Sequence, residues 1–69
     1  MNIQQLQYAL AVYRAGSISG AAASLYIAQP NLSSIIRSLE EELGYPIFIR
    51  TSRGVKPTEQ GLEALRQAA

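Results

Sequence analysis

Apolar residues recur at steps of three and four positions over most of the chain, a spacing that places side chains on one face of an α-helix. The first such segment predicts an amphipathic helix over Asn2–Arg14, and its main apolar positions are Ile3, Leu6, Leu10 and Tyr13. Gly16 follows and suits the left-handed conformation in which many helices end. We therefore expect the chain to open with a helix that buries one side.

A second, shorter helix is predicted over Ile18–Leu25, with Ser17 or Ser19 as its N-cap. The run Ala21–Ala23 makes one side of this helix very small, which suits a close crossing with another helix. The alternative is an ordinary alanine-rich helix of high propensity. The residues Tyr26–Ala28 are predicted to form a tight turn after it.

A third, longer helix is predicted from Gln29 to Leu43, with Pro30 near its start, where the missing N–H costs nothing. Ala28 lacks the side-chain oxygen of an N-cap, which costs about 1 kcal/mol relative to Ser or Thr. One apolar stripe is predicted to be core: Leu32, Ile35, Ile36, Leu39 and Leu43. Short helix, turn and longer helix form a helix-turn-helix pattern over about 18–37, which can lay its second helix in a DNA major groove.

The opposite face of the third helix is short and polar at its start and acidic at its end. Ser hydroxyls and Asn amides hydrogen-bond phosphates and base edges. The candidate DNA contacts on this helix are Gln29, Pro30, Asn31, Ser33, Ser34 and Arg37. The run Glu40–Glu42 follows and repels phosphates, so only the first turns are expected to meet DNA. Taken alone, this face fits a recognition surface and a plain solvent face equally well.

A two-stranded hairpin, or wing, is predicted over about 47–57. Ile47–Ile49 is β-prone, Val55–Pro57 can pair with it, and Arg50–Gly54 supplies a polar turn. Arg53 can reach a minor groove, whose negative potential attracts arginine. The candidate DNA contacts of the wing are Arg50, Thr51 and Arg53, with Lys56 as a further candidate for phosphate. The alternative is that these cations only solvate a hairpin, but beside a helix-turn-helix the DNA interpretation is favoured.

Thr58 is predicted to cap a last helix over Glu59–Ala69, with Glu59 in its positive first turn. A narrow apolar seam runs along this helix and consists of Leu62, Leu65 and Ala69. The seam has no evident partner in the chain, so we expect it to pair with a second copy as a homodimer interface, or the chain to be a fragment of something longer. The two explanations, a homodimer interface and a fragment of a longer protein, are compatible.

The composition excludes several classes of function. The 69 residues suffice for one domain and include no Cys and no His, so disulfides and ordinary zinc centres are ruled out. There is also no Asp, and the usual nucleophile–base pairs cannot be built. We expect no enzyme activity, no metal and no cofactor. With no signal peptide and no membrane-length apolar run in the sequence, a cytoplasmic location is expected.

The net charge of +1 is low for a nucleic-acid-binding protein. Its distribution is uneven, because three of the five carboxylates fall in Glu40–Glu42 whereas Arg50, Arg53 and Lys56 share a segment without acids. A local basic patch is therefore predicted. The near-neutral total also supports an alternative function, a small helical dimerisation or protein-interaction module without DNA binding.

In order and without gaps, these segments resemble the N-terminal DNA-binding domain of LysR-type transcriptional regulators over Met1–Gly61. Each matching piece is weak alone, and the set is specific. The pieces are Leu6 with Tyr8, Gly16-Ser17, Ala21-Ala22 with Leu25, Gln29-Pro30, Leu32-Ser33, Ile36, Leu39-Glu40, Leu43-Gly44, Phe48, Arg50-Thr51, Arg53, Thr58-Glu59 and Gly61.

The resemblance implies a mainly α fold in which residues 1–58 form a winged helix-turn-helix with a three-helix core and a two-stranded wing. Residues 59–69 then begin a linker helix that dimerises the domain. It also implies sequence-specific binding of double-stranded DNA at an inverted-repeat operator, and an effector-binding domain, with its small-molecule effector, outside this chain. In the family, residues matching Gln29, Pro30 and Ser33 face the major groove, and the residue matching Arg53 reaches the minor groove.

Three positions depart from the family pattern. Many members carry Arg at the position of Ser34, Ser or Thr at that of Ala28, and Gln at that of Ile35. A bidentate Arg–guanine pair is worth about 1–3 kcal/mol of discrimination. We therefore expect a changed operator preference at the base that an arginine would read, and weaker binding by the isolated domain.

Overall fold

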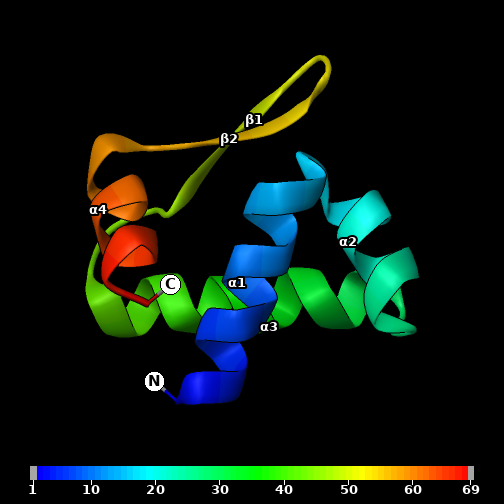
Figure 1. Cartoon of the computed structure of the whole chain (residues 1–69), viewed down its shortest axis with the longest axis horizontal. Coiled ribbons are helices and arrows are strands. Elements are labelled where there is room, and N and C mark those ends of the chain that lie inside the picture. Colours follow the sequence, from blue (N-terminus) through cyan, green and yellow to red (C-terminus); the bar gives the residue numbers. More distant parts are fainter. Residues whose placement is uncertain (1, 69) are drawn as a thin grey trace.

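The computed structural model describes residues 2–68, which fold into four helices and one antiparallel two-stranded sheet (Figure 1). The elements in chain order are α1 (Ile3–Ala15), α2 (Ile18–Leu25), α3 (Gln29–Leu43), β1 (Phe48–Thr51), β2 (Gly54–Pro57) and α4 (Glu59–Ala68). The predicted mainly α, winged helix-turn-helix fold is confirmed. None of these helices is long and apolar enough to cross a membrane.

Local capping signals set where the first two helices begin. Asn2 accepts the backbone N–H of Gln5 at 2.8 Å, and the Gln5 side chain accepts the Asn2 N–H at 3.1 Å, which is a capping box at the start of α1. Ser17, rather than Ser19, caps α2 by accepting the N–H of Gly20 at 3.0 Å. Short polar side chains thus occupy backbone donors that the helices leave unpaired.

Residues in the left-handed conformation end the first three helices. Gly16 ends α1 with φ 75°, and Gly44 ends α3 with φ 84°. Tyr26 ends α2 with φ 59°, an uncommon conformation for a residue with a side chain, and its side chain is exposed. Each lets the chain leave its helix within a few residues, and the connection from α2 to α3, residues 26–28, is the tight turn predicted for a helix-turn-helix.

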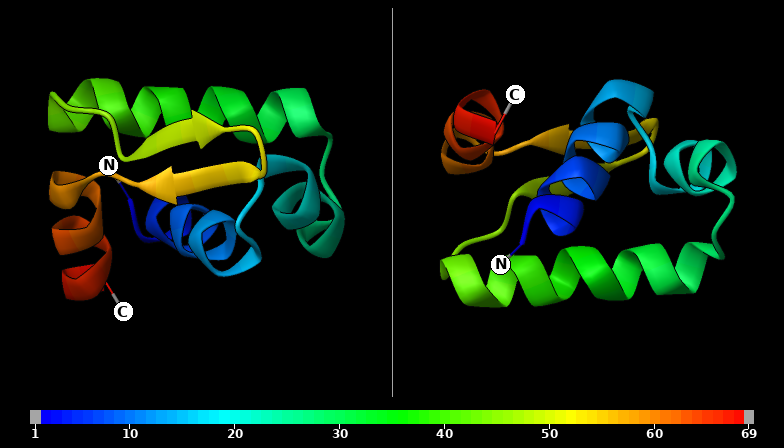
Figure 2. Two further views of the ribbon diagram at one scale, coloured as in Figure 1. Left: turned by 90° about the horizontal axis from the view of Figure 1, so that it is seen from above. Right: turned by 60° about the horizontal axis from the view of Figure 1, so that its bottom comes forward.

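The wing reaches back over the helices. Figures 1 and 2 show α3 crossing beside α1 and α2, with the hairpin of β1 and β2 extending from the C-terminal end of α3 and the start of α4 across α1. The hairpin is held to the α1–α2 turn, where Val55 donates its N–H to the Gly16 carbonyl at 2.9 Å. Gly54 sits directly over this turn, and a Cβ there would overlap the Gly16 carbonyl. The wing therefore lies beside the helix-turn-helix rather than free in solvent.

One hydrophobic core joins all four helices and the start of the hairpin. Its buried members are Ala9, Leu10, Val12, Ile18, Ala21, Ala22, Leu32, Ile36, Leu39, Ile47 and Leu65. The predicted stripe of α3 is confirmed at Leu32, Ile36 and Leu39, and Leu43 packs at the edge of the core. Ile35 is only half-buried and is not among the core residues, so that part of the prediction is wrong.

The prediction for the seam of α4 needs correction. Leu65 has 2% of its surface exposed and belongs to the core of this chain, since α4 packs against α1. It cannot present its side chain to a second copy as an interface residue. Leu62 is half-buried, and Ala69 lies outside the described residues. A domain this small needs the apolar face of α4 to complete its own core.

Candidate nucleic-acid interface

The first turns of α3 present most of the predicted contact residues to solvent. Five of them are exposed and Ser33 is half-buried; the exposed ones are Gln29, Pro30, Asn31, Ser34 and Arg37. Ala28 stands at the N-cap with extended backbone, φ −69° and ψ 140°, and its side chain makes no capping bond. The positive end of the α3 dipole therefore faces outward without a side-chain cap, an environment that suits anions.

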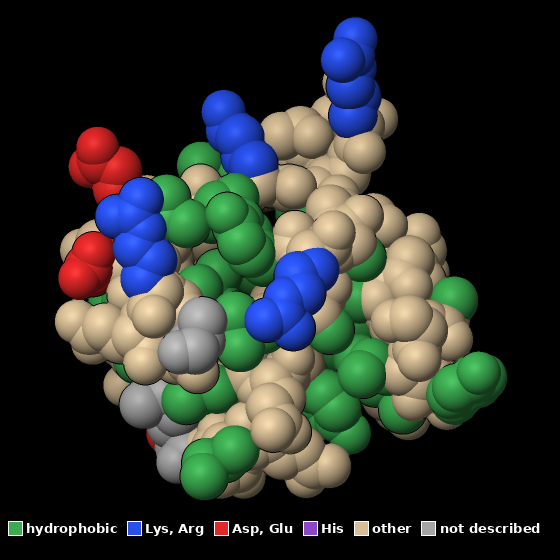
Figure 3. Space-filling model, viewed as in Figure 1, with side chains coloured by type: hydrophobic (Ala, Val, Ile, Leu, Met, Phe, Trp, Pro, Cys, Tyr) green, Lys and Arg blue, Asp and Glu red, His purple; other side chains and the backbone are tan. Residues whose placement is uncertain are grey.

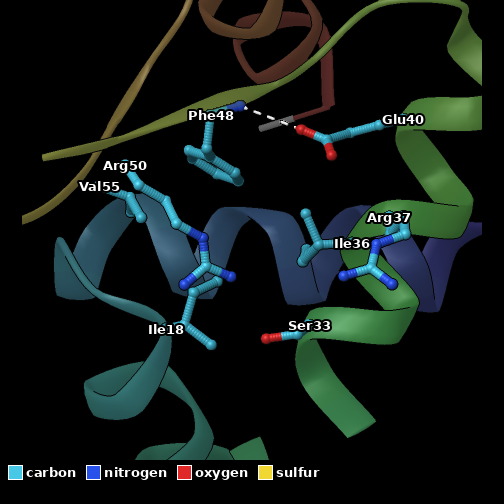
Figure 4. Close-up of a pocket in the computed structure, with 8 residues that line it drawn as sticks. All are labelled: Ile18, Ser33, Ile36, Arg37, Glu40, Phe48, Arg50 and Val55. Carbon is cyan, nitrogen blue, oxygen red and sulfur yellow. Dashed lines mark hydrogen bonds between the residues drawn. The ribbon is translucent and has the colours of Figure 1, made fainter. Parts of the chain in front are cut away.

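A hollow of about 150 Å³ lies between α3 and the wing. In Figure 4 the guanidinium groups of Arg37, from α3, and Arg50, from β1, extend toward this hollow from opposite sides, and the Ser33 hydroxyl points into it. Its apolar lining consists of Ile18, Ile36, Phe48 and Val55. Two cations and a hydroxyl at one opening form a set of donors that suits phosphate oxygens and base edges.

A second hollow, of about 210 Å³, shares Arg50 with the first. It brings the starts of α2 and α3 together with the wing, because Ser17, Gln29 and Thr51 all line it, as does Ser19. The sequence predicts Ser17 and Ser19 only as helix caps. Their place on this surface depends on the hairpin folding back to the α1–α2 turn, which no local sequence pattern reveals.

The hairpin has longer strands and a shorter turn than predicted. Thr51 pairs with Gly54, so the turn consists of Ser52 and Arg53 alone, whereas the sequence predicts a turn over Arg50–Gly54. Arg53 is exposed at this tip and donates its backbone N–H to the Thr51 hydroxyl at 3.3 Å. The tip projects from the helices in Figure 1. Arg53 is thus held on a short, ordered turn.

The predicted basic patch is split by the sheet. Arg50 pairs with Val55, and both line the hollow that faces α3. Lys56 pairs with Ile49 and lies one position along β2, so its side chain points to the other face of the hairpin. Lys56 therefore does not join Arg50, and Arg37 of α3 takes its place as the neighbouring cation. This prediction was wrong because strand pairing was not known.

Charge is unevenly spread over the molecular surface. In Figure 3 the visible acidic side chains lie on the α4 side with a Lys or Arg side chain directly beside them, and further Lys and Arg side chains project from the hairpin and from the middle of the face. The acids of α4 are Glu59 and Glu63. The same helix carries Arg66 in its last turn, so α4 holds charges of both signs, whereas Arg50, Arg53 and Lys56 of the hairpin have no acid among them.

Glu40 has a partner that the sequence does not reveal. Its Oε2 accepts the backbone N–H of Ile47 at 2.7 Å and that of Phe48 at 3.3 Å, and Figure 4 shows the second of these bonds. The sequence groups Glu40 with Glu41 and Glu42 as an acidic end of the helix that repels phosphates. Glu40 instead points at the start of β1. This hydrogen-bonding role of Glu40 depends on the packing of the wing against α3 and cannot be predicted from neighbouring residues.

The pairing of α2 and α3, with a hairpin beside them, defines a winged helix-turn-helix domain. A sequence profile described as "Bacterial regulatory helix-turn-helix protein, lysR family" matches residues 3–62. The chain belongs to this family.

Known proteins similar to the chain agree with this assignment. It is 46% identical over 69 residues to the HTH-type transcriptional regulator AbaB of Streptomyces antibioticus, which covers 100% of the chain and 23% of AbaB. The chain spans between about a fifth and two fifths of the length of the curated relatives it matches.

Two solved structures of related domains with DNA have nearly the same fold. The crystal structure of the BenM_DBD/benA site 1 DNA complex matches with a TM-score of 0.93 and 44% identity, over 99% of this chain and 76% of that one. The crystal structure of the CbnR_DBD–DNA complex matches with a TM-score of 0.93 and 35% identity, over 99% of this chain and 78% of that one.

Proposed function

We propose that this chain is the DNA-binding domain of a bacterial LysR-type transcriptional regulator and that it binds double-stranded DNA in a sequence-specific manner. The observation that carries the proposal is the surface between α3 and the wing, where Arg37, Arg50 and Ser33 face one hollow. The similarity to domains solved with DNA supports it. In this proposal the chain, like its family, acts in transcription regulation and not as an enzyme. Its location is the cytoplasm, where bacterial DNA lies.

In this proposal α3 is the recognition helix and enters the major groove by its N-terminal half. The exposed amide, ring and hydroxyl groups there are short, which allows the backbone of the helix to approach the bases closely. The base-reading and groove-facing residues are Gln29, Pro30, Asn31, Ser33, Ser34 and Arg37. Since Ser34 stands where many relatives have Arg, one direct guanine contact is replaced by a weaker hydroxyl contact.

The wing supplies the second set of contacts. Arg53 stands exposed at the two-residue tip, where an arginine can enter a minor groove, and narrow A·T-rich grooves attract it most. Arg50 and Thr51 lie nearer to α3 and contact the phosphates between the two grooves. In this division, α3 recognises the base sequence, and the wing fixes the position of the domain along the duplex.

We further propose that the domain works as a homodimer through α4, so that two recognition helices meet the half-sites of an inverted repeat. Leu62 remains the candidate interface residue of α4, with Ala69 beyond the described residues. Leu62 lines a shallow hollow of about 210 Å³ between α1 and α4 together with Leu10 and Tyr13. The small-molecule effector is expected to bind a separate C-terminal domain of the regulator.

Duplex binding as a function of salt tests the proposal. If the positive charges of Arg37, Arg50 and Arg53, in the grooves or at the phosphates, each displace one counterion from the duplex, the logarithm of the binding constant should fall with log salt at a slope of roughly −3 per protomer. The probe is an inverted-repeat duplex selected from a random pool by the chain itself, with a scrambled duplex as control. Failure to enrich or bind any duplex at low salt would reject DNA binding and favour a protein-interaction module.

A further inference from the structure

The start of β1 is held from two sides. Its N–H side faces α3, where Glu40 accepts from Ile47 at 2.7 Å and from Phe48 at 3.3 Å. Its carbonyl side faces α4, where the Thr58 N–H donates to the Ile47 carbonyl at 2.9 Å. Ile47 itself is 1% exposed. The root of the wing is therefore a fixed point, and Glu40 is the side chain that joins it to α3.

Glu40 lies one turn beyond Arg37 on α3, and Phe48 lies two positions before Arg50 on β1. All four residues line the hollow between α3 and the wing. A bond from Glu40 to the strand therefore fixes the spacing between the helix that carries Arg37 and the strand that carries Arg50. In Figure 4 the Glu40 carboxylate points toward Phe48, away from the open side on which the two guanidinium groups lie.

We propose that Glu40 is a positioning residue that sets the wing at the distance from α3 required for both to contact one duplex. This inference rests on the proposed DNA binding and adds a mechanism to it. A carboxylate accepting two backbone N–H groups is a strong acceptor, and its removal leaves the Ile47 donor buried without a partner. The wing would then no longer be held in one direction relative to α3, and Arg50 and Arg53, which it carries, would no longer be held in place against the duplex.

This positioning predicts an effect opposite to that of charge alone. A carboxylate on a DNA-binding helix repels phosphates, so its removal should strengthen binding by electrostatics. Glu41, which is exposed on the same turn of α3, provides the matched control for that effect. If Glu40 positions the wing, its removal should weaken binding although it also removes a negative charge.

The experiment compares Glu40→Ala, Glu40→Gln, Glu41→Ala and Glu41→Gln in binding to the selected inverted-repeat duplex at fixed low salt. We expect Glu40→Ala to bind about tenfold more weakly, the loss expected for one hydrogen bond to a charged group. Glu40→Gln retains an acceptor oxygen and should bind at or slightly below the wild-type affinity. Both Glu41 variants should bind as tightly as wild type or more tightly.

A double-mutant cycle with Arg53→Ala separates positioning from a general loss of structure. If Glu40 acts through the wing, Glu40→Ala should cost less in the Arg53→Ala background, because one of the wing contacts that Glu40 positions is already lost. Amide hydrogen exchange of Ile47, measured without DNA, should accelerate in Glu40→Ala and remain unchanged in Glu41→Ala. If Glu40→Ala does not fold, Glu40→Gln should still bind more weakly than Glu41→Gln, because both remove one negative charge but only Glu40→Gln weakens the bonds to Ile47 and Phe48.

The inference is overturned if Glu40 and Glu41 variants strengthen binding alike, or if the losses from Glu40→Ala and Arg53→Ala simply add. Unchanged exchange at Ile47 in Glu40→Ala would overturn it without reference to DNA. A wild-type chain that binds no duplex would instead reject the proposed function, and this inference with it.

Discussion

Ala28 is the N-cap residue of α3, and it leaves the first turn of the recognition helix without a side-chain cap. The following turn contains Pro30, which has no N–H, so the Asn31 N–H is the donor that a cap side chain at position 28 would reach. The backbone at Ala28 already has the extended conformation of a capping residue. The start of α3 therefore lacks only the side-chain oxygen that would accept this N–H and stabilise the helix.

We expect Ala28→Ser to stabilise the domain by about 1 kcal/mol, since the new hydroxyl can accept the Asn31 N–H without any change of backbone. In a domain of this size that gain raises Tm by about 4–8 °C, which thermal denaturation followed by circular dichroism can measure. The control is Ala23→Ser, the same change at an exposed position inside α2, which should lower Tm slightly. Equal shifts in the two variants would contradict the capping argument.

At the scale of elements, the wing is positioned by its two ends rather than by its own two strands. Its tip end is bonded to the α1–α2 turn through Val55 and Gly16, and its root lies against Glu40 and Gly61. A lone two-stranded hairpin is marginally stable in water. The contacts at the two ends therefore account for an ordered wing on so small a domain.

Gly61 tests this close packing between α4 and the root of the wing. A Cβ at Gly61 would overlap the Ile47 carbonyl, so Gly61→Ala should destabilise the domain by about 1–3 kcal/mol. Helix propensity alone predicts the opposite sign, a gain of about 1 kcal/mol for Gly to Ala. Urea denaturation measures the difference, with Gln60→Ala on the exposed side of the same turn as control. A stabilised Gly61→Ala would show that the packing is looser than described.

At the scale of the whole molecule, the two leucines of the α4 seam differ in burial, although both line the hollow between α1 and α4. Leu65 is buried in the core against α1, whereas Leu62 is half-buried and lines the hollow together with Leu10 and Tyr13. A charge at Leu65 would therefore unfold the domain and reveal nothing about assembly. Among the described seam residues, Leu62 is the one at which a substitution can test dimerisation without removing a core side chain.

We expect Leu62→Glu to convert a dimeric chain into folded monomers, because a carboxylate would replace apolar surface at the proposed interface. Sedimentation velocity measures the assembly state and circular dichroism the fold. Gln60→Glu adds the same charge at an exposed position of α4 and should leave the dimer intact. A Leu62→Glu dimer, or a wild-type chain that is already monomeric, would contradict dimerisation through this part of α4.

Helices, caps and turns of this protein follow from neighbouring residues alone, since their signals act over a few positions. The 3.6-residue spacing marks the helices, Asn2 and Gly16 bound the first of them, and Pro30 marks the start of α3. The same local reading selected the polar first turns of α3 as the candidate contact surface. It also led to the correct family, because these signals occur in a fixed order along the chain.

Only the tertiary structure decided which charges act together. Arg50 and Lys56 are separated by the pairing register of the hairpin, and Arg37 joins Arg50 across a hollow that links distant segments. Likewise Leu65 belongs to the core because α4 packs against α1. Glu40 accepts a backbone N–H at the root of the wing because the residues before β1 lie against α3. Spacing along a chain determines the face of a helix or strand on which a residue lies, but what that face meets depends on how the elements pack.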